Sequence, residues 1–325
     1  MADVTDSPVS TLRHTRTSTQ ADDFLAALIE VLNGRFGPDL ISTYIVGSRA
    51  ANTVLSSSDI DLALVFRGKL APERRAEIRR WLRKLQALTP VMMDTVVVDE
   101  TEIVRGLTSN LVCNRLLAGA DTFAGLPQVK RSEMLLYHGG LAVHFMLAVR
   151  GWPKRFTFPL TYPQPDGRFR GYELSGTRVA EGQYVPGLNI YAGLVLGLAS
   201  FRLAIEAGAY PGAKGEALPA YRQHLPHDRY RPLVEDVEEI CRSRHQGRIP
   251  TDEFEISRLS LRCTETLAWE NEVLGLLLLN LPAWLPLDNP ELRKQAIEFL
   301  SLLDCHSPQH AAEVATAKKM LGMPA

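Results

Sequence analysis

Residues Tyr44–Phe66 read YIVGSRAANTVLSSSDIDLALVF, and the rest of the chain is organised around this stretch. An apolar run ends in Gly47-Ser48, a polar loop follows, and a second apolar run opens with Asp59 and Asp61. Runs rich in β-branched and aromatic residues on both sides of a loop predict two strands. The stretch therefore predicts a strand, a tight turn, a loop and a second strand that begins with two carboxylates.

The two predicted strands cover Ile41–Val46 and Ile60–Phe66. Side chains alternate between the faces of a strand, so Asp59 and Asp61 project on the same side. A third predicted strand, Val91–Val98, contains Asp94 within an apolar run. An ionised carboxylate buried there without a partner would be very costly, so this residue needs a reason to be present.

Three carboxylates that converge on one point favour a metal site. At a separation of about 4 Å each pair repels by about 4 kcal/mol at an effective dielectric near 20. A hard divalent cation removes that penalty, and Mg²⁺ or Mn²⁺ prefers carboxylate, phosphate and water oxygens. Asp59, Asp61 and Asp94 are therefore the predicted metal ligands and catalytic residues.

The turn between the first strand and the loop is suited to phosphate. Gly47 permits close approach of the backbone, and Ser48 can donate its amide and its hydroxyl. Arg49 can add a charge-assisted contact. Carboxylates next to a phosphate-binding turn predict metal-dependent transfer chemistry on ATP or another nucleoside triphosphate.

The order of the remaining predicted elements indicates two domains. Residues 1–20 read as a flexible tail, residues 21–125 as a small α/β domain, and residues 126–325 as a helical domain. Within the helical domain, residues 156–186 lose the helical period and contain an Asp166-Gly167 turn signal, which predicts an extended or hairpin flap. The predicted helices are, in chain order, residues 18–34, 72–88, 101–117, 132–149, 188–207, 233–244, 252–279, 290–303 and 309–321.

Composition limits the function classes. The formal net charge of the 325-residue chain is −1, so nucleic-acid binding would have to be local. The four cysteines lie far apart without a zinc-type or disulfide pattern, which favours a reducing cytoplasm. The apolar stretches Leu188–Ile205 and Val273–Leu285 are interpreted as buried helices, so no membrane partner is expected.

The motif set resembles the nucleotidyltransferase superfamily that includes DNA polymerase beta. The matching elements are Val46-Gly47-Ser48, the loop of residues 49–58, Asp59-Ile60-Asp61-Leu62, and Asp94 on a later strand. The resemblance covers residues 40 to 100. It implies a polymerase-beta-like domain with a small mixed sheet, two-metal nucleotidyl transfer and a helical C-terminal bundle, with the active site between the two halves.

Within that superfamily the chain is most similar to the bacterial aminoglycoside adenylyltransferases that act on streptomycin and spectinomycin. The similarity rests on Ser58-Asp59-Ile60-Asp61-Leu62, on Asp94-Thr95-Val96-Val97 and on the helical second half. It implies that Lys214 contacts nucleotide phosphate. The sequence departs from the family where Ala213 replaces a serine and Asp94 replaces the glutamate that serves as catalytic base.

The resemblance implies transfer of AMP to a hydroxyl of a small-molecule acceptor, with release of pyrophosphate. Two alternatives remain open. One is a toxin-type transferase that acts on the end of a tRNA, for which the basic face of the helix at Pro72–Leu88 would be the binding surface. The other is a nucleotide-binding or antitoxin protein without catalysis. A solvated outer face is the simpler interpretation of that basic helix.

Overall fold

The computed structural model describes residues 21–53, 59–88, 92–174, 177–178, 184–285 and 289–324. The predicted tail, residues 54–58 of the predicted loop and the start of the third predicted strand lie outside these ranges. The chain divides into two compact units, Met1–Val129 and Lys130–Ala325. The sequence places this boundary near residue 125. Each unit is described by itself.

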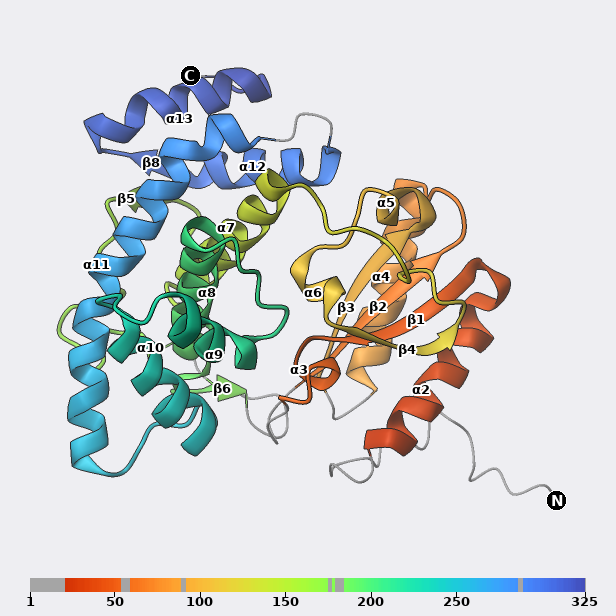
Figure 1. Ribbon diagram of the computed structural model, residues 1–325, viewed down its shortest axis with the longest axis horizontal. Helices are drawn as coiled ribbons and strands as arrows, with labels where there is room; N and C mark the ends of the chain where they lie inside the picture. The colour runs from red at the N-terminus through yellow and green to blue at the C-terminus, as the bar shows by residue number, and fades with distance from the viewer. Residues whose placement is uncertain are drawn as a thin grey trace. The chain divides into compact units, whose positions relative to one another are not determined.

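The first unit is an α/β unit built on one four-stranded sheet (Figure 1). The strand order is β3-β2-β1-β4, with β1 antiparallel to both of its neighbours and β2 parallel to β3. The sheet is therefore mixed, as the sequence predicts. The elements are α2 (Ala21–Phe36), a 3₁₀ turn (Gly37–Asp39), β1 (Leu40–Val46), α3 (Gly47–Ala50), β2 (Ile60–Phe66), α4 (Pro72–Ala87), β3 (Met93–Asp99), α5 (Glu100–Ile103), α6 (Ser109–Val112) and β4 (Asn114–Gly119).

Both faces of the sheet are covered, which explains why β1 and β2 are buried along almost their whole length. On one face, α2 and α4 pack on the strands through an apolar cluster that includes Phe24, Leu28, Phe66 and Ile78. On the other face, the segment after β3 contributes a second cluster, in which the ring of Phe123 stacks on that of Tyr44 with 4.0 Å between centroids.

The predicted helix over residues 101–117 is wrong in its last part. The structure has only the single turns α5 and α6 there, and Asn114–Gly119 forms β4 on the outer edge of β1. The side chains of β4 are exposed or half-buried, so its hydrophobic pattern carried no strand signal. Backbone pairing with β1 decides its conformation, and a Cβ built on Gly119 would overlap the backbone carbonyl of Ile41.

The second unit is largely helical and holds the largest apolar cluster of the protein. Helices α7 and α8 lie at its centre, and α11 runs along one side of the unit (Figure 1) and contributes its apolar face to the same cluster. Its elements are α7 (Arg131–Ala148), β5 (Phe156–Phe158), β6 (Thr177–Arg178), β7 (Tyr184–Val185), α8 (Asn189–Glu206), α9 (Lys214–His224), α10 (Arg231–Asp236), a π-helix (Val237–Arg244), α11 (Glu253–Trp284), α12 (Pro290–Leu302), β8 (Leu303–Cys305) and α13 (Pro308–Leu321).

Helix α8 is the one helix in the described ranges whose length and composition would allow it to cross a membrane. However, 72% of its apolar window is buried inside the protein. A helix that is apolar on all sides is expected at the centre of a helical unit. The interpretation of Leu188–Ile205 as a buried helix agrees with this burial.

The structure describes residues 156–174, 177–178 and 184–186 of the predicted flap. Strands β6 and β7 form a short antiparallel pair, but the turn signal at Asp166-Gly167 does not connect them. That dipeptide lies in a series of turns in which the Gly167 amide donates to the Gln164 carbonyl at 3.0 Å. Phe169 and Tyr172 from the same segment are buried in the helical core. Burial of these aromatic rings, together with the pairing of Phe156–Phe158 with Leu303–Cys305, holds the segment in place.

Contacts of the buried Asp99 carboxylate hold α4, which connects β2 to β3, against the sheet. Asp99 is 2% exposed at the end of β3, where it accepts hydrogen bonds from the backbone amides of Leu70, Thr101 and Glu102. The Arg75 guanidinium contacts the same carboxylate at 3.1 Å and the Val97 carbonyl at 2.6 Å. Burial alone would raise the pKa of Asp99, but the hydrogen bonds from the Thr101 hydroxyl and from the three backbone amides outweigh it and hold the pKa below its ordinary value.

The contacts of the Asp99 carboxylate predict that Asp99→Asn destabilises the protein. The variant should lose about 1–3 kcal/mol of unfolding free energy at pH 7, because hydrogen bonds to a charged group are removed. Since the folded-state pKa lies below the unfolded value, the wild-type advantage should be present above about pH 4 and disappear as the pH falls below it. Urea unfolding of both proteins between pH 3 and pH 7 measures this. Asp39→Asn, which changes an exposed ion pair with Arg74, is the control and should change stability little.

Candidate active site

The turn after β1 lies directly against the start of β2. Gly47 has a positive φ of 65°, and a Cβ built on it would overlap the Oδ2 atom of Asp61. Only glycine fits both requirements at this position. The backbone of the predicted phosphate turn and the second predicted metal ligand are therefore in direct proximity.

The predicted phosphate-binding residues begin a single helical turn. Gly47, Ser48 and Arg49 belong to α3, and the Ser48 carbonyl accepts a hydrogen bond from the Thr53 amide at 2.9 Å. The Arg49 side chain donates from Nε to the backbone carbonyl of Asp59 at 3.3 Å. This bond links the two ends of the loop whose residues 54–58 are outside the described ranges. Arg49 thus holds the start of the second motif close to the first.

The third predicted carboxylate is brought beside the first two by the register of the sheet. In the parallel pair of β2 and β3, Asp61 is the partner of Asp94, while Ile60 pairs with Met93 and Leu62 with Thr95. Paired residues on neighbouring strands project on the same face. Asp59 precedes Asp61 by two residues and is exposed at the same edge.

The expectation that Asp94 is buried in an apolar strand is wrong. Its side chain is exposed, and its Oδ1 atom accepts a hydrogen bond from the Thr95 amide at 2.8 Å. The reason is that β3 is an edge strand of the sheet, so its first residues face solvent despite their apolar neighbours. No desolvation cost therefore has to be offset at Asp94.

The donor set suits a hard divalent cation, although the side chains are not closed around a common point. Among the described residues, no group of three or more His, Cys, Asp or Glu side chains is arranged to hold a metal ion. Asp59, Asp61 and Asp94 nevertheless present carboxylates at one edge, two of them exposed, next to a turn without a side chain at Gly47. Carboxylate oxygens are the ligands that Mg²⁺ and Mn²⁺ prefer.

The predicted phosphate-binding lysine lies in the second unit. Lys214 is the first residue of α9 and is exposed. Its Nζ atom lies 5.1 Å from the centroid of the Phe145 ring, within the range of a cation–π interaction. The Phe145 ring packs in turn on α8, where a Cβ at Gly193 would approach it to 2.5 Å. The sequence did not predict α9, and it gave no signal for this aromatic support.

Sequence reasoning also missed a buried charged cluster in the second unit. The Arg150 guanidinium binds the fully buried Glu270 carboxylate through both terminal nitrogens, at 2.6 and 2.9 Å, and Tyr172 donates to the same carboxylate at 2.5 Å. Burial and the neighbouring Glu270 raise the pKa of Tyr172, so its hydroxyl remains a donor. The sequence carried little signal for this cluster, because Glu270 is followed by the polar residues Asn271 and Glu272 and Arg150 follows the predicted helix over residues 132–149.

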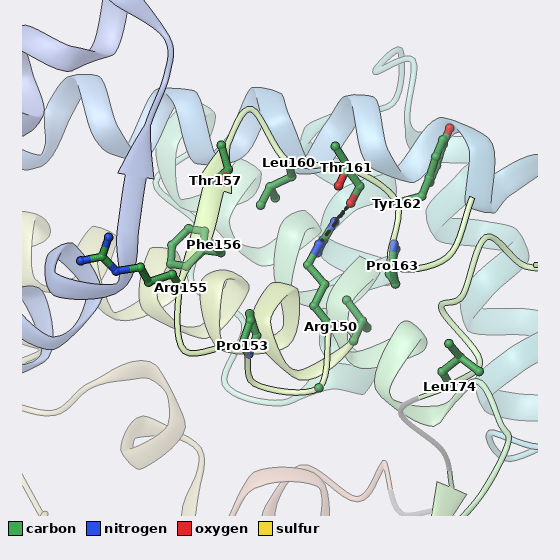
Figure 2. A pocket seen from close by; sticks show the side chains of 12 residues that line it. Arg150, Pro153, Arg155, Phe156, Thr157, Leu160, Thr161, Tyr162, Pro163 and Leu174 are labelled. Carbon is green, nitrogen blue, oxygen red and sulfur yellow. Dashed lines mark hydrogen bonds between the residues drawn. The ribbon is translucent and has the colours of Figure 1, made fainter. Parts of the chain in front are cut away.

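Arg150 also lines a cavity of about 440 Å³ in this unit. Figure 2 shows its guanidinium directed at the backbone of Thr161, whose carbonyl accepts a hydrogen bond at 2.9 Å. All the terminal nitrogens of Arg150 are thus bound within the protein. None of the predicted site residues lines this cavity, and its charged group has a structural role.

Residues 25–114 match the family model of the nucleotidyltransferase domain. This range contains the Gly-Ser turn and all three predicted carboxylates. The match confirms the nucleotidyltransferase domain predicted from the sequence, its place in the N-terminal half, and the prediction of an enzyme of nucleotidyl transfer. No match was found among the curated proteins.

Two solved structures show a more distant likeness. One is a candidate nucleotidyltransferase from Sulfolobus solfataricus, with 27% identity, a TM-score of 0.23, and coverage of 30% of this chain and 80% of that chain. The other is spectinomycin adenyltransferase AAD(9) from Enterococcus faecialis with ATP and spectinomycin, with 14% identity, a TM-score of 0.43, and coverage of 75% and 99%. At TM-scores below 0.5, neither likeness adds to what the family model establishes.

Because a Cβ on Gly47 would overlap the Asp61 carboxylate, we expect Gly47→Ala to disturb the site in addition to straining the backbone. Gly68→Ala is a matched control, because Gly68 has a φ of 61° but open space around a Cβ. Both variants should lose about 1–2 kcal/mol of unfolding free energy, because alanine disfavours the left-handed backbone conformation. Only Gly47→Ala should also displace Asp61 and weaken binding of Mg²⁺-nucleotide, measured by calorimetry. Equal nucleotide affinity of the two variants would contradict this account.

Proposed function

Starting from the nucleotidyltransferase domain of residues 25–114, we propose that the protein transfers a nucleoside monophosphate, AMP from ATP, to a hydroxyl group and releases pyrophosphate. The observation that carries the proposal is the juxtaposition of three elements in the first unit. Gly47 lies against Asp61, and Asp61 is paired with Asp94 across β2 and β3. Phosphate-binding backbone and paired carboxylates are the groups that such a transfer requires.

In this proposal Asp59 and Asp61 hold Mg²⁺ or Mn²⁺. A divalent cation held by these carboxylates would stabilise the charge that develops on the leaving group. The amide and hydroxyl of Ser48, reached over the bare Gly47 backbone, bind the β- and γ-phosphates. Arg49 contributes positive charge at the same turn, and Lys214 binds phosphate.

Asp94 acts on the acceptor side of the reaction. Its exposed carboxylate can accept the proton of the attacking hydroxyl as general base, or serve as a third metal ligand. Its Oδ1 atom is oriented by the Thr95 amide. Aspartate is one methylene shorter than glutamate, so the acceptor hydroxyl must approach β3 more closely than it would with a glutamate base.

A small-molecule hydroxyl is the first candidate acceptor, because the sequence motifs are most similar to those of aminoglycoside adenylyltransferases. A nucleic-acid end is the second candidate, and the exposed arginines of α4 favour it. Absence of Mg²⁺-nucleotide binding in calorimetry would favour the third alternative, a protein without catalysis. Incubation with labelled ATP, Mg²⁺ and both kinds of acceptor distinguishes these possibilities.

The metal-ligand assignment predicts that the double variant Asp59→Asn, Asp61→Asn loses label transfer by roughly 10²- to 10³-fold, the range found when a group that stabilises the transition state is removed. The fold should be retained, because Asp59 is exposed and Asp61 is only half-buried. Asp166→Asn, an exposed aspartate in the second unit, is the control. Equal transfer by the double variant and the wild type would refute the assignment.

The phosphate role of Lys214 predicts a separate effect. Lys214→Ala should weaken Mg²⁺-ATP binding about tenfold, equivalent to about 1.4 kcal/mol, because one charge-assisted contact is lost. Lys319→Ala removes an exposed lysine of α13 and should leave binding unchanged. Calorimetric affinities provide the comparison. If Lys214→Ala binds as tightly as the wild type, Lys214 has no part in the site.

A further inference from the structure

Helix α4 presents four exposed cations, Arg79, Arg80, Arg83 and Lys84, which we call the α4 basic face. We propose that this face docks the phosphodiester backbone of a nucleic-acid strand whose terminal hydroxyl is the acceptor. The acceptor role rests on the proposed function. The docking itself rests on the charge and position of the helix.

The basic residues of α4 fall into two groups. Arg74 is paired with Glu77 and Asp39, and Arg75 is held by Asp99. Both arginines therefore stabilise the unit itself. By contrast, none of the four residues of the α4 basic face forms an ion pair or side-chain hydrogen bond with any residue that the structure describes.

The α4 basic face is unfavourable for the isolated helix. Arg79 and Arg83, and likewise Arg80 and Lys84, are four residues apart, so like charges lie one above the other. Such pairs destabilise a helix, and alternation with acidic residues would remove the cost. An external polyanion also removes it, because each phosphate neutralises the repulsion between neighbouring cations. The arrangement therefore fits a multivalent anionic partner.

The position of α4 connects this face to the proposed catalytic edge. Because β2 and β3 are parallel, α4 must return from the end of β2 to the beginning of β3. Its C-terminal part therefore lies at the edge where Asp61 and Asp94 begin their strands. Gln86 fixes this placement, since its Oε1 atom accepts a hydrogen bond from the Met93 amide at 2.6 Å. Met93 and α4 belong to one face of the sheet, whereas Asp61 and Asp94 project on the other face. A strand docked on the α4 basic face would therefore reach these carboxylates around the end of the sheet at which β3 begins.

The same geometry argues against other polyanionic surfaces. The apolar side of α4 is buried against the sheet through Ile78 and Leu85, so it cannot insert into a lipid bilayer. The four cations extend over about 7.5 Å of helix axis, a row that exceeds one phosphate group and suits consecutive phosphates of a strand. Arginine also binds phosphate in a bidentate manner. Because the net charge of the whole chain is −1, attraction to a polyanion must come from a local basic surface such as this face.

The test measures binding of fluorescein-labelled single-stranded 20-nucleotide RNA and DNA by anisotropy at several salt concentrations. The variant replaces all four residues, Arg79→Gln, Arg80→Gln, Arg83→Gln and Lys84→Gln. If each residue contacts one phosphate, the slope of log affinity against log salt should fall by about 2.8, and affinity near 0.1 M salt should fall roughly tenfold or more. The melting temperature checks that the exposed changes leave the fold intact.

A control variant removes the same number of positive charges from the second unit, Lys154→Gln, Arg155→Gln, Lys294→Gln and Lys319→Gln, all of them exposed. It should bind the oligonucleotides as the wild type does. Equal losses in the two variants would mean that binding follows net charge and would overturn the proposal. Absence of salt-dependent binding by the wild type would also overturn it. A stronger effect with RNA than with DNA would identify RNA as the strand.

Transfer assays separate this proposal from the proposed function. Label transfer from ATP to the oligonucleotide end that depends on the α4 basic face supports both. Transfer to a small molecule without oligonucleotide binding would overturn the docking proposal and leave the proposed function intact. Oligonucleotide binding that the α4 variant abolishes, together with no transfer to any acceptor, would support docking and refute the proposed function.

Discussion

The parallel register of β2 and β3 is the constraint on which the rest of the first unit depends. It places Asp61 beside Asp94, although these residues are separated by a complete helix in the sequence. The same register requires α4 to cross over one face of the sheet and return to the catalytic edge. A shift by one residue would turn either carboxylate to the opposite, apolar face.

The two aspartates of β3 that lie at its ends differ strongly in burial. At the end of β3, Asp99 is nearly inaccessible and is bound by Arg75 and by three backbone amides. At the beginning of β3, Asp94 is exposed and has one backbone hydrogen bond. The buried end fixes the strand, and the exposed end leaves a carboxylate available for a ligand. Strand β3 thus contains one aspartate that stabilises the fold, Asp99, and one that is available for a ligand, Asp94.

The sequence identified most of the site residues because these residues lie close together along the chain. Gly47, Asp59 and Asp61 lie on one turn and one strand, so alternation and glycine conformation predict their arrangement. The exposure of Asp94 was not accessible in this way, since it depends on β3 being at the edge of the sheet. Likewise, β4 lacks a burial pattern of its own and takes its conformation from pairing with β1.

The sequence by itself determined the strand–turn–strand motif, the helical character of the second half and the residue types suited to metal and phosphate. Local periodicity and the conformational limits of glycine and aspartate contain that information. Only the tertiary structure decided which basic residues of α4 are available. Arg75 and Arg79 have the same chemistry, but Arg75 faces the buried Asp99 while Arg79 faces solvent. Helix packing against the sheet makes this distinction, because it sets which side of α4 meets the rest of the unit.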